Sequence, residues 1–142
     1  VMLDSPEDDP HPYVYSHVLQ IFHANASAKN GLNFRPMEFI WVRWYRRDAR
    51  YRAGWKYKRL HRVGFVPHDE PGAFGFLDPA DVVRGVHLIP QFRYGRTDAA
   101  LPRSMARSFD DAEDDMDWRW YNVNWFVDRD MVMRYHDDAI GH

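Results

Sequence analysis

The sequence contains no cysteine, which excludes disulfide bonds and thiolate metal sites and favours an intracellular protein. No apolar run approaches the roughly 20 residues that cross a membrane as a helix. The first residues, "VMLDSPEDDPHP", are acidic and unlike a signal peptide. We therefore expect an intracellular chain with no membrane partner.

The common signatures of nucleotide-binding and hydrolytic enzymes are also missing. There is no G-x-G-x-x-G after a strand, no G-x-x-x-x-G-K-[ST], no G-x-S-x-G and no H-E-x-x-H. The eight histidines are dispersed, and even His17 and His23, on one predicted strand face, lie roughly 20 Å apart at about 3.3 Å per residue. A metal site would need distant histidines to meet in the fold, so we expect neither a metal nor a cofactor.

Aromatic residues carry most of the apolar mass, which suits strands better than helical bundles. Nine prolines and eight glycines interrupt the chain at short intervals. Hydrophobic alternation predicts strands or extended segments at 12–24, 37–45, 55–66, 86–92 and 118–135, the last one bent near Asp128. Asp78, Pro79 and Gly85 predict a single helical turn, and Asn30-Gly31 predicts a turn between the first two strands. The fold class expected is mainly β, a small single-domain β-barrel with one or two short helical turns.

Charge is segregated along the chain. We expect residues 1–11 to form an acidic extension and residues 12–142 to form the barrel domain, with a loop at about 96–117 that ends in "DDAEDDMD". The segment 41–62, "WVRWYRRDARYRAGWKYKRLHR", holds nine Lys or Arg and one acid, whereas the chain as a whole has a net charge of −2. The acidic blocks are typical of solvated loops, and they could also screen the basic segment.

The basic segment predicts a surface for a polyanion, because cations neutralise phosphates and exposed rings stack on bases. The expected phosphate contacts are Arg43, Arg46, Arg47, Arg50, Arg52, Lys56, Lys58, Arg59 and Arg62. The expected aromatic contacts are Trp41, Tyr45, Trp55 and Tyr57. Trp44 is expected in the core with Ile40 and Val42, on the strand face opposite Trp41. Two alternatives remain open: the rings are core and the cations merely solvated, or the rings cage a methylated ammonium.

Several blocks of the sequence, in order, resemble the C-terminal region of Plavaka-type transposases, transposon-derived proteins of mushroom-forming fungi. These blocks are "HPYVYSHVLQIFHAN", "FIWVRWYRRD", "AGWKYKRLHRVGFV", "AFGFLDPADVVRGVHLIPQFRYGRT" and "YNVNWFVDRDMVMRYHDDAIGH". The resemblance runs from about residue 10 to the end. It implies a nuclear protein of a fungal mobile element and a module that accompanies the transposase rather than its catalytic core.

The sequence is also similar, over shorter stretches, to the bromo-adjacent homology (BAH) domain, a β-barrel chromatin reader. The similarity rests on "VRWYRRD", on "VVRGVHLIP" and on a late aromatic strand. It implies a BAH-like barrel. The Pro that usually follows the Arg in that family is absent, and Arg47-Asp48 stands there, which puts a histone-reading role in doubt.

Two functions follow as expectations. The first is a non-catalytic module that binds DNA or chromatin through residues 43–62. The alternative is a small-molecule enzyme or ligand-binding barrel with an aromatic pocket, in which His17 and Asp128 act as acid–base groups.

Overall fold

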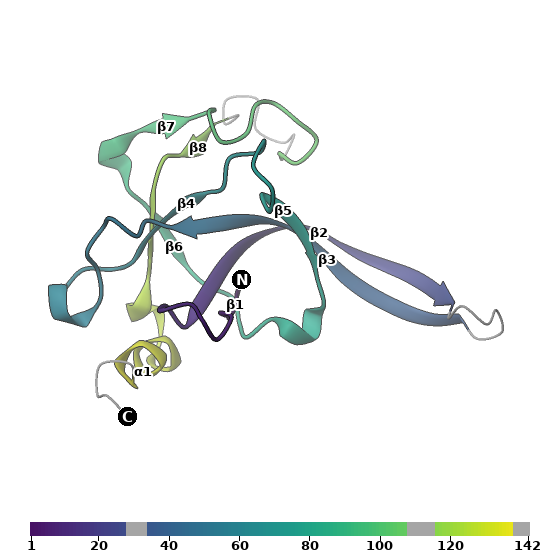
Figure 1. The fold of residues 1–142 in the computed structure, drawn as a ribbon, viewed down its shortest axis with the longest axis horizontal. Helices are drawn as coiled ribbons and strands as arrows, with labels where there is room; N and C mark the ends of the chain where they lie inside the picture. The colour runs from purple at the N-terminus through teal and green to yellow at the C-terminus, as the bar shows by residue number, and fades with distance from the viewer. Residues whose placement is uncertain (28–33, 108–115, 138–142) are drawn as a thin grey trace.

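Two long strands, β2 (Tyr13–Ser27) and β3 (Phe34–Arg47), pair antiparallel as a hairpin. The computed structural model describes residues 1–27, 34–107 and 116–137, so the predicted Asn30-Gly31 turn lies outside the described residues. The outer part of the hairpin projects well beyond the other strands (Figure 1). Both strands are longer than their alternating patterns predicted.

Seven strands form one curled sheet, a half-barrel, in the order β1-β2-β3-β4-β9-β6 with β5 also beside β3. The other members are β1 (Met2–Asp4), β4 (Arg62–Phe65), β5 (Phe74–Leu77), β6 (Leu88–Pro90) and β9 (Tyr121–Val123). Two further strands, β7 (Arg96–Thr97) and β8 (Asp117–Trp118), pair with each other. The expectation of a small, mainly β single domain is confirmed.

Residues 1–11 are not an extension of the domain, and that prediction is wrong. Strand β1 pairs antiparallel with β2 through Met2–Tyr15, Leu3–Val14 and Asp4–Tyr13. The side chain of Met2 is fully buried in the core. The acidic residues of this segment predicted a solvated extension. The apolar residues Met2 and Leu3 instead join the segment to the sheet.

Short 3-10 turns occur at η1 (Trp55–Tyr57), η2 (Pro79–Asp81), η3 (Phe92–Tyr94) and η4 (Trp125–Val127). The predicted cap of η2 is confirmed, because the Asp78 carboxylate accepts the Ala80 N–H at 2.9 Å. The turn ends at Val82, before the predicted end at Gly85. The predicted strand at 55–66 is formed only as β4, because η1 occupies its first residues.

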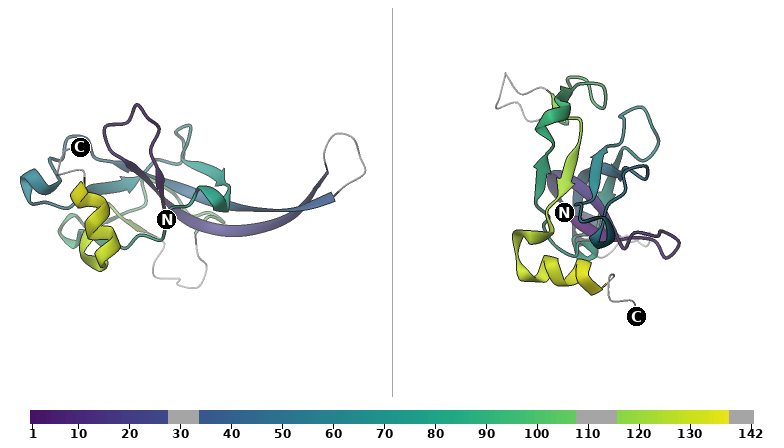
Figure 2. Two further views of the ribbon diagram at one scale, coloured as in Figure 1. Left: turned by 90° about the horizontal axis from the view of Figure 1, so that it is seen from below. Right: turned by 90° about the vertical axis from the view of Figure 1, so that its left-hand side faces the viewer.

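A helix, α1 (Arg129–Asp137), replaces the second half of the strand predicted at 118–135. The Asp128 carboxylate accepts the Met131 N–H at 3.0 Å and so caps the helix. Met131 and Tyr135, four residues apart on one helix face, are both buried in the core. Figure 2 shows α1 at the end of the molecule away from the outer hairpin.

The main core lies between the half-barrel and α1. Its buried members are Met2, Tyr15, Val63, Val123, Trp125, Met131 and Tyr135. Ile40 and Val42 are buried as predicted, but Trp44 is only half-buried, as is Trp41 on the opposite face. Within the part of the chain that the structure describes, no helix has the length and apolar character needed to cross a membrane.

Candidate nucleic-acid interface

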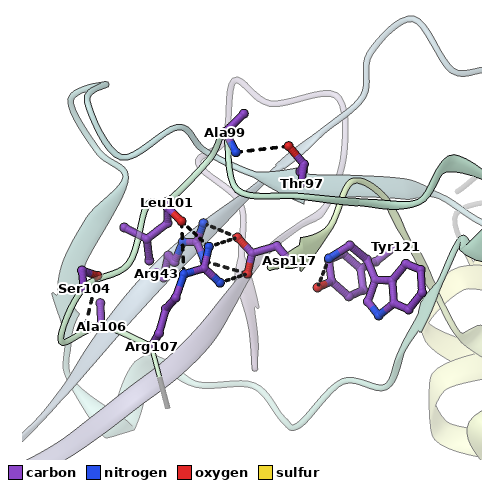
Figure 3. Close-up of polar contacts among 10 residues, drawn as sticks. Arg43, Thr97, Ala99, Leu101, Ser104, Ala106, Arg107, Asp117 and Tyr121 are labelled. Carbon is purple, nitrogen blue, oxygen red and sulfur yellow. Dashed lines mark hydrogen bonds and ion pairs between the residues drawn. The ribbon is translucent and has the colours of Figure 1, made fainter. Parts of the chain in front are cut away.

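Arg43 is a buried structural cation, so its predicted contact with phosphate is wrong. It is only 3% exposed. Its two terminal nitrogens donate to the Asp117 carboxylate at 3.1 and 2.8 Å, and its guanidinium lies 3.6 Å from the centre of the Phe65 ring. Arg107 donates to the same carboxylate at 3.2 and 3.3 Å. Figure 3 shows both guanidinium groups directed at Asp117.

Arg62 is also engaged within the fold. Its Nε and a terminal nitrogen donate to one Asp48 oxygen at 3.1 and 2.5 Å. Its guanidinium lies over the rings of Tyr51 at 4.1 Å and Trp120 at 4.7 Å. Burial alone would raise the pKa of Asp48, but the hydrogen bonds from Arg62 and from backbone N–H groups outweigh it and lower the pKa. The side chain of Arg62 therefore stabilises the start of β4 and is engaged there instead of contacting a phosphate.

Arg46 and Arg47 form ion pairs as Arg43 and Arg62 do, but their side chains are at least partly exposed. Arg46 is exposed and forms a two-pronged ion pair with Glu70. Arg47 lies 3.7 Å from an Asp9 carboxylate oxygen, and both side chains are about one-third exposed. Exposed pairs of this kind contribute little to stability, so a phosphate can compete for either cation.

The other five predicted cations are exposed and lie together in the connection between β3 and β4. They are Arg50, Arg52, Lys56, Lys58 and Arg59. Among the described residues none of them forms an ion pair. We call residues 50–59 the basic loop. It lies at the end of the molecule opposite the outer hairpin (Figure 1).

The backbone of the basic loop is closed on itself. The Gly54 N–H donates to the Arg59 carbonyl at 2.8 Å, and the two residues form an isolated β-bridge. Gly54 has φ of 101°, which a residue with a side chain adopts only under strain. Lys58 has φ of 51°, in the left-handed region. This closure brings the cations of the loop onto one compact projection.

The four predicted aromatic contacts divide into two pairs. Tyr45 stacks on Phe65 at 4.2 Å, burial raises its pKa, and it lies against the core. Trp41 is half-buried and packs on Phe74. Tyr57, which is 41% exposed, and Trp55, which is half-buried, are both in the basic loop. The basic loop therefore combines cations with two partly accessible rings.

Phe126 adds an aromatic surface that the sequence did not single out. It is 64% exposed, and its ring meets that of Trp55 edge-on at 6.2 Å. It belongs to η4, which directly precedes α1. The sequence offered no signal for this position, because Phe126 reaches the basic loop only through the tertiary fold.

A pocket of about 650 Å³ lies beside the basic loop. Its walls include His11, His61, Trp55, Trp125 and Tyr135. Trp125 and Tyr135 are stacked at 5.0 Å, and Trp55 lies 5.5 Å from Trp125. These side chains come from segments that are distant in the sequence, so their meeting could not be predicted from the sequence.

Both histidines of this pocket are held neutral at physiological pH. Burial, followed by the nearby His61 and Arg47, lowers the pKa of His11 to about 3. Burial and then Arg47 lower the pKa of His61 to about 4. The two rings are 4.4 Å apart, and His11 Nε2 is 2.9 Å from the Tyr15 hydroxyl, which also contacts the Tyr135 hydroxyl.

The residues of the predicted acid–base pair are engaged separately. His17 is exposed, and its ring meets Phe65 edge-on at 6.1 Å. Asp128 caps α1 and pairs with Arg84 at 2.5 Å. In the described part of the chain no interaction joins the two. Their arrangement gives no proton-transfer pair.

Across residues 1–27, 34–107 and 116–137, no three His, Asp or Glu side chains come close enough to hold a metal ion. The geometry that remains is an exposed cationic loop with aromatic rings and an adjoining pocket. Comparisons with protein-family models, with curated proteins and with solved structures find no match to this chain.

Proposed function

We propose that this protein is a nucleic-acid-binding module that contacts phosphates through the basic loop. The observation that carries the proposal is the set of five exposed lysines and arginines that form no ion pair among the described residues. Cations that form no ion pair with the described residues can neutralise phosphates and release bound counterions, which drives association with nucleic acid. Such a concentration of positive charge in one loop is more than solubility requires.

Exposed rings beside the cations favour nucleic acid over a featureless polyanion. Tyr57 and Phe126 are 41% and 64% exposed, next to the loop cations. Flat rings on a basic surface offer stacking positions for bases. The resemblance to Plavaka-type transposases supports the same function, and it suggests DNA or chromatin in a fungal nucleus as the setting.

The enzyme alternative has less support, because His17 and Asp128 are engaged with different partners. A catalytic pair must lie within hydrogen-bond reach of one substrate. The proposed function is accordingly binding without catalysis.

The test measures DNA affinity as a function of salt. For the unmodified chain, the logarithm of the association constant should fall by about 0.9 for each duplex phosphate contacted, per tenfold rise in salt. The double variant Arg52→Gln/Lys58→Gln should reduce this slope by about that amount for each contact removed. The matched control is Arg35→Gln/Arg93→Gln, which removes the same charge from exposed positions outside the basic loop.

An equal loss of slope in both variants would mean that net charge, rather than the basic loop, governs binding. Absence of binding at low salt would refute the proposed function. Circular dichroism of each variant checks that the half-barrel is retained.

A further inference from the structure

The pocket beside the basic loop is lined by aromatic side chains, as sites that bind a flat ring often are. Trp55 belongs to the basic loop and is half-buried, so part of its indole is accessible. Behind it, Trp125 and Tyr135 are stacked in near-parallel planes, with 19° between them. The pocket of about 650 Å³ is within the usual size range of small-ligand sites. Trp125 and Tyr135 are only 2% and 3% exposed, so Trp55 is the ring that offers an accessible face on which a planar occupant can stack.

His61 gives the pocket a donor and an acceptor for hydrogen bonds. Neither of its ring nitrogens has a hydrogen-bond partner among the described residues, and neither is sealed from solvent. Its pKa of about 4 keeps the ring neutral, so one nitrogen donates and the other accepts. A heterocycle whose edge carries both kinds of group can therefore pair with His61.

The charges around the pocket disfavour a cation such as a methylated ammonium. Lys56 lines the pocket, and Arg47 is close enough to lower the pKa of both pocket histidines. Asp9 is the acid that lines the pocket, and it is already paired with Arg47 at 3.7 Å. The surroundings suit a neutral ring that is attached to an anionic group.

We infer that this pocket accepts an unstacked nucleobase of a single-stranded nucleic acid, while the phosphates on either side of that base contact the basic loop. The inference rests on the proposed function, and it narrows the ligand from any nucleic acid to one with free bases. Trp55 and Lys56 are consecutive residues that both line the pocket, so one turn presents a stacking face and a cation together. A nucleotide likewise carries a flat base and an anionic phosphate as neighbouring groups.

Three DNA ligands of equal length separate the two parts of the inference: oligothymidylate, the same strand annealed to its complement, and a strand of abasic sugar-phosphates. The abasic strand retains the phosphates but offers no base. Oligothymidylate should bind about 5- to 150-fold more tightly than the abasic strand, as one base stacked on an aromatic ring would contribute. Oligouridylate, tested in parallel, shows whether RNA is accepted as well as DNA.

The residue tested in the pocket is His61. His61→Phe keeps a ring of similar shape but removes both nitrogens, so it should lower the affinity for oligothymidylate and leave the affinity for the abasic strand unchanged. His61→Gln restores a donor and an acceptor and should recover most of the preference. His68→Phe is the matched control, because His68 is exposed and lies outside the pocket. Thermal unfolding of each variant reports on folding.

The outcomes separate the inference from the proposed function. Equal affinities for the base-containing and abasic strands, with no effect of His61→Phe, would overturn the base pocket and leave phosphate binding by the basic loop intact. If no ligand binds, and Arg52→Gln/Lys58→Gln changes nothing, the proposed function fails and the inference fails with it. If His61→Phe unfolds, the His61→Gln variant and the abasic comparison still decide the result.

Discussion

The charged side chain of Arg43 is buried in the half-barrel, where the carboxylate of Asp117 neutralises it. Asp117 serves both Arg43 and Arg107, and the three side chains are between 3% and 11% exposed. Arg43 Nε is buried without a hydrogen-bond partner, so this guanidinium depends on Asp117 and on the Phe65 ring. A buried charge that loses its partner is far more costly than a surface pair that breaks.

Asp117→Asn should therefore lower the free energy of unfolding by about 3–5 kcal/mol, because it leaves two buried guanidinium groups without a counter-charge. Glu70→Gln is the matched control. It removes the partner of the exposed Arg46 and should leave the free energy of unfolding nearly unchanged. Urea denaturation measures both values. Similar small losses in the two variants would show that Arg43 is not stabilised mainly by Asp117.

His11 makes stability depend on pH between neutrality and mild acid. An unfolded histidine titrates near pH 6.5, but the folded pKa of His11 is about 3, chiefly because of burial. As the pH falls below 6.5, the unfolded chain gains a proton that the folded chain does not, so stability is lost down to the folded pKa. Arg47 and His61 reinforce this effect, and Asp9 opposes it.

Between pH 7 and pH 5 we expect His11 to reduce the free energy of unfolding by about 2 kcal/mol. His61, with a folded pKa of about 4, should contribute a similar loss. In the variant His11→Gln, the difference in stability between the two pH values should shrink by about 2 kcal/mol, whatever the variant's absolute stability. An unchanged pH difference would mean that His11 takes up a proton in the folded state.

At the scale of elements, strands were predictable where alternation is regular, and the C-terminal helix was not. The aromatic run that ends at Val123 favours strands, and that part does form β9. Beyond it, the helix depends on the Asp128 cap and on Met131 and Tyr135 four residues apart. Both signals are present in the sequence, but one helical turn of spacing is too short to outweigh the β-like composition before it.

The helix should contribute to stability through its buried face. Met131→Ala removes a fully buried side chain from the core and should lower the free energy of unfolding by about 2–5 kcal/mol. Met133→Ala, on the same helix, changes a residue that is 47% exposed and should have an effect of less than about 1 kcal/mol. Equal effects in chemical denaturation would show that α1 does not dock as described.

Part of the candidate site was readable from the sequence. The density of cations in residues 41–62 identified the region of the basic loop. Which cations form ion pairs inside the fold could not be predicted from the sequence, because Asp117 lies 74 residues from Arg43 in the chain. The pocket could not be predicted either, since His11, His61 and Tyr135 come from distant segments and meet only when α1 packs against the half-barrel.

At the scale of the whole molecule, opposite charges occupy different stretches of one chain. The five acids at 110–115 lie outside the described residues, and together they exceed the net charge of −2. An acidic stretch tethered to a basic surface competes with nucleic acid for the same cations. The effect is strongest at low ionic strength, where screening is weak.

Replacing residues 110–115 with Gly and Ser, with Asp117 retained, should raise DNA affinity at low salt and have little effect at high salt. Asp117 must stay because it neutralises Arg43. Replacing the acids with Asn and Gln at the same length is the control for chain length. Unchanged affinity at low salt in both variants would show that the acids do not compete for the basic loop.

The outer part of the β2–β3 hairpin should unfold locally more easily than the rest of the sheet. Beside this hairpin, β1 pairs with β2 only at Tyr13–Tyr15, and β5 pairs with β3 only at Ile40–Arg43. The outer strands are thus joined mainly to each other, with ring contacts such as Phe22 on Phe39. We expect local unfolding of this ribbon to leave the core intact, so its amide protons should exchange with solvent sooner than those of β4 and β9.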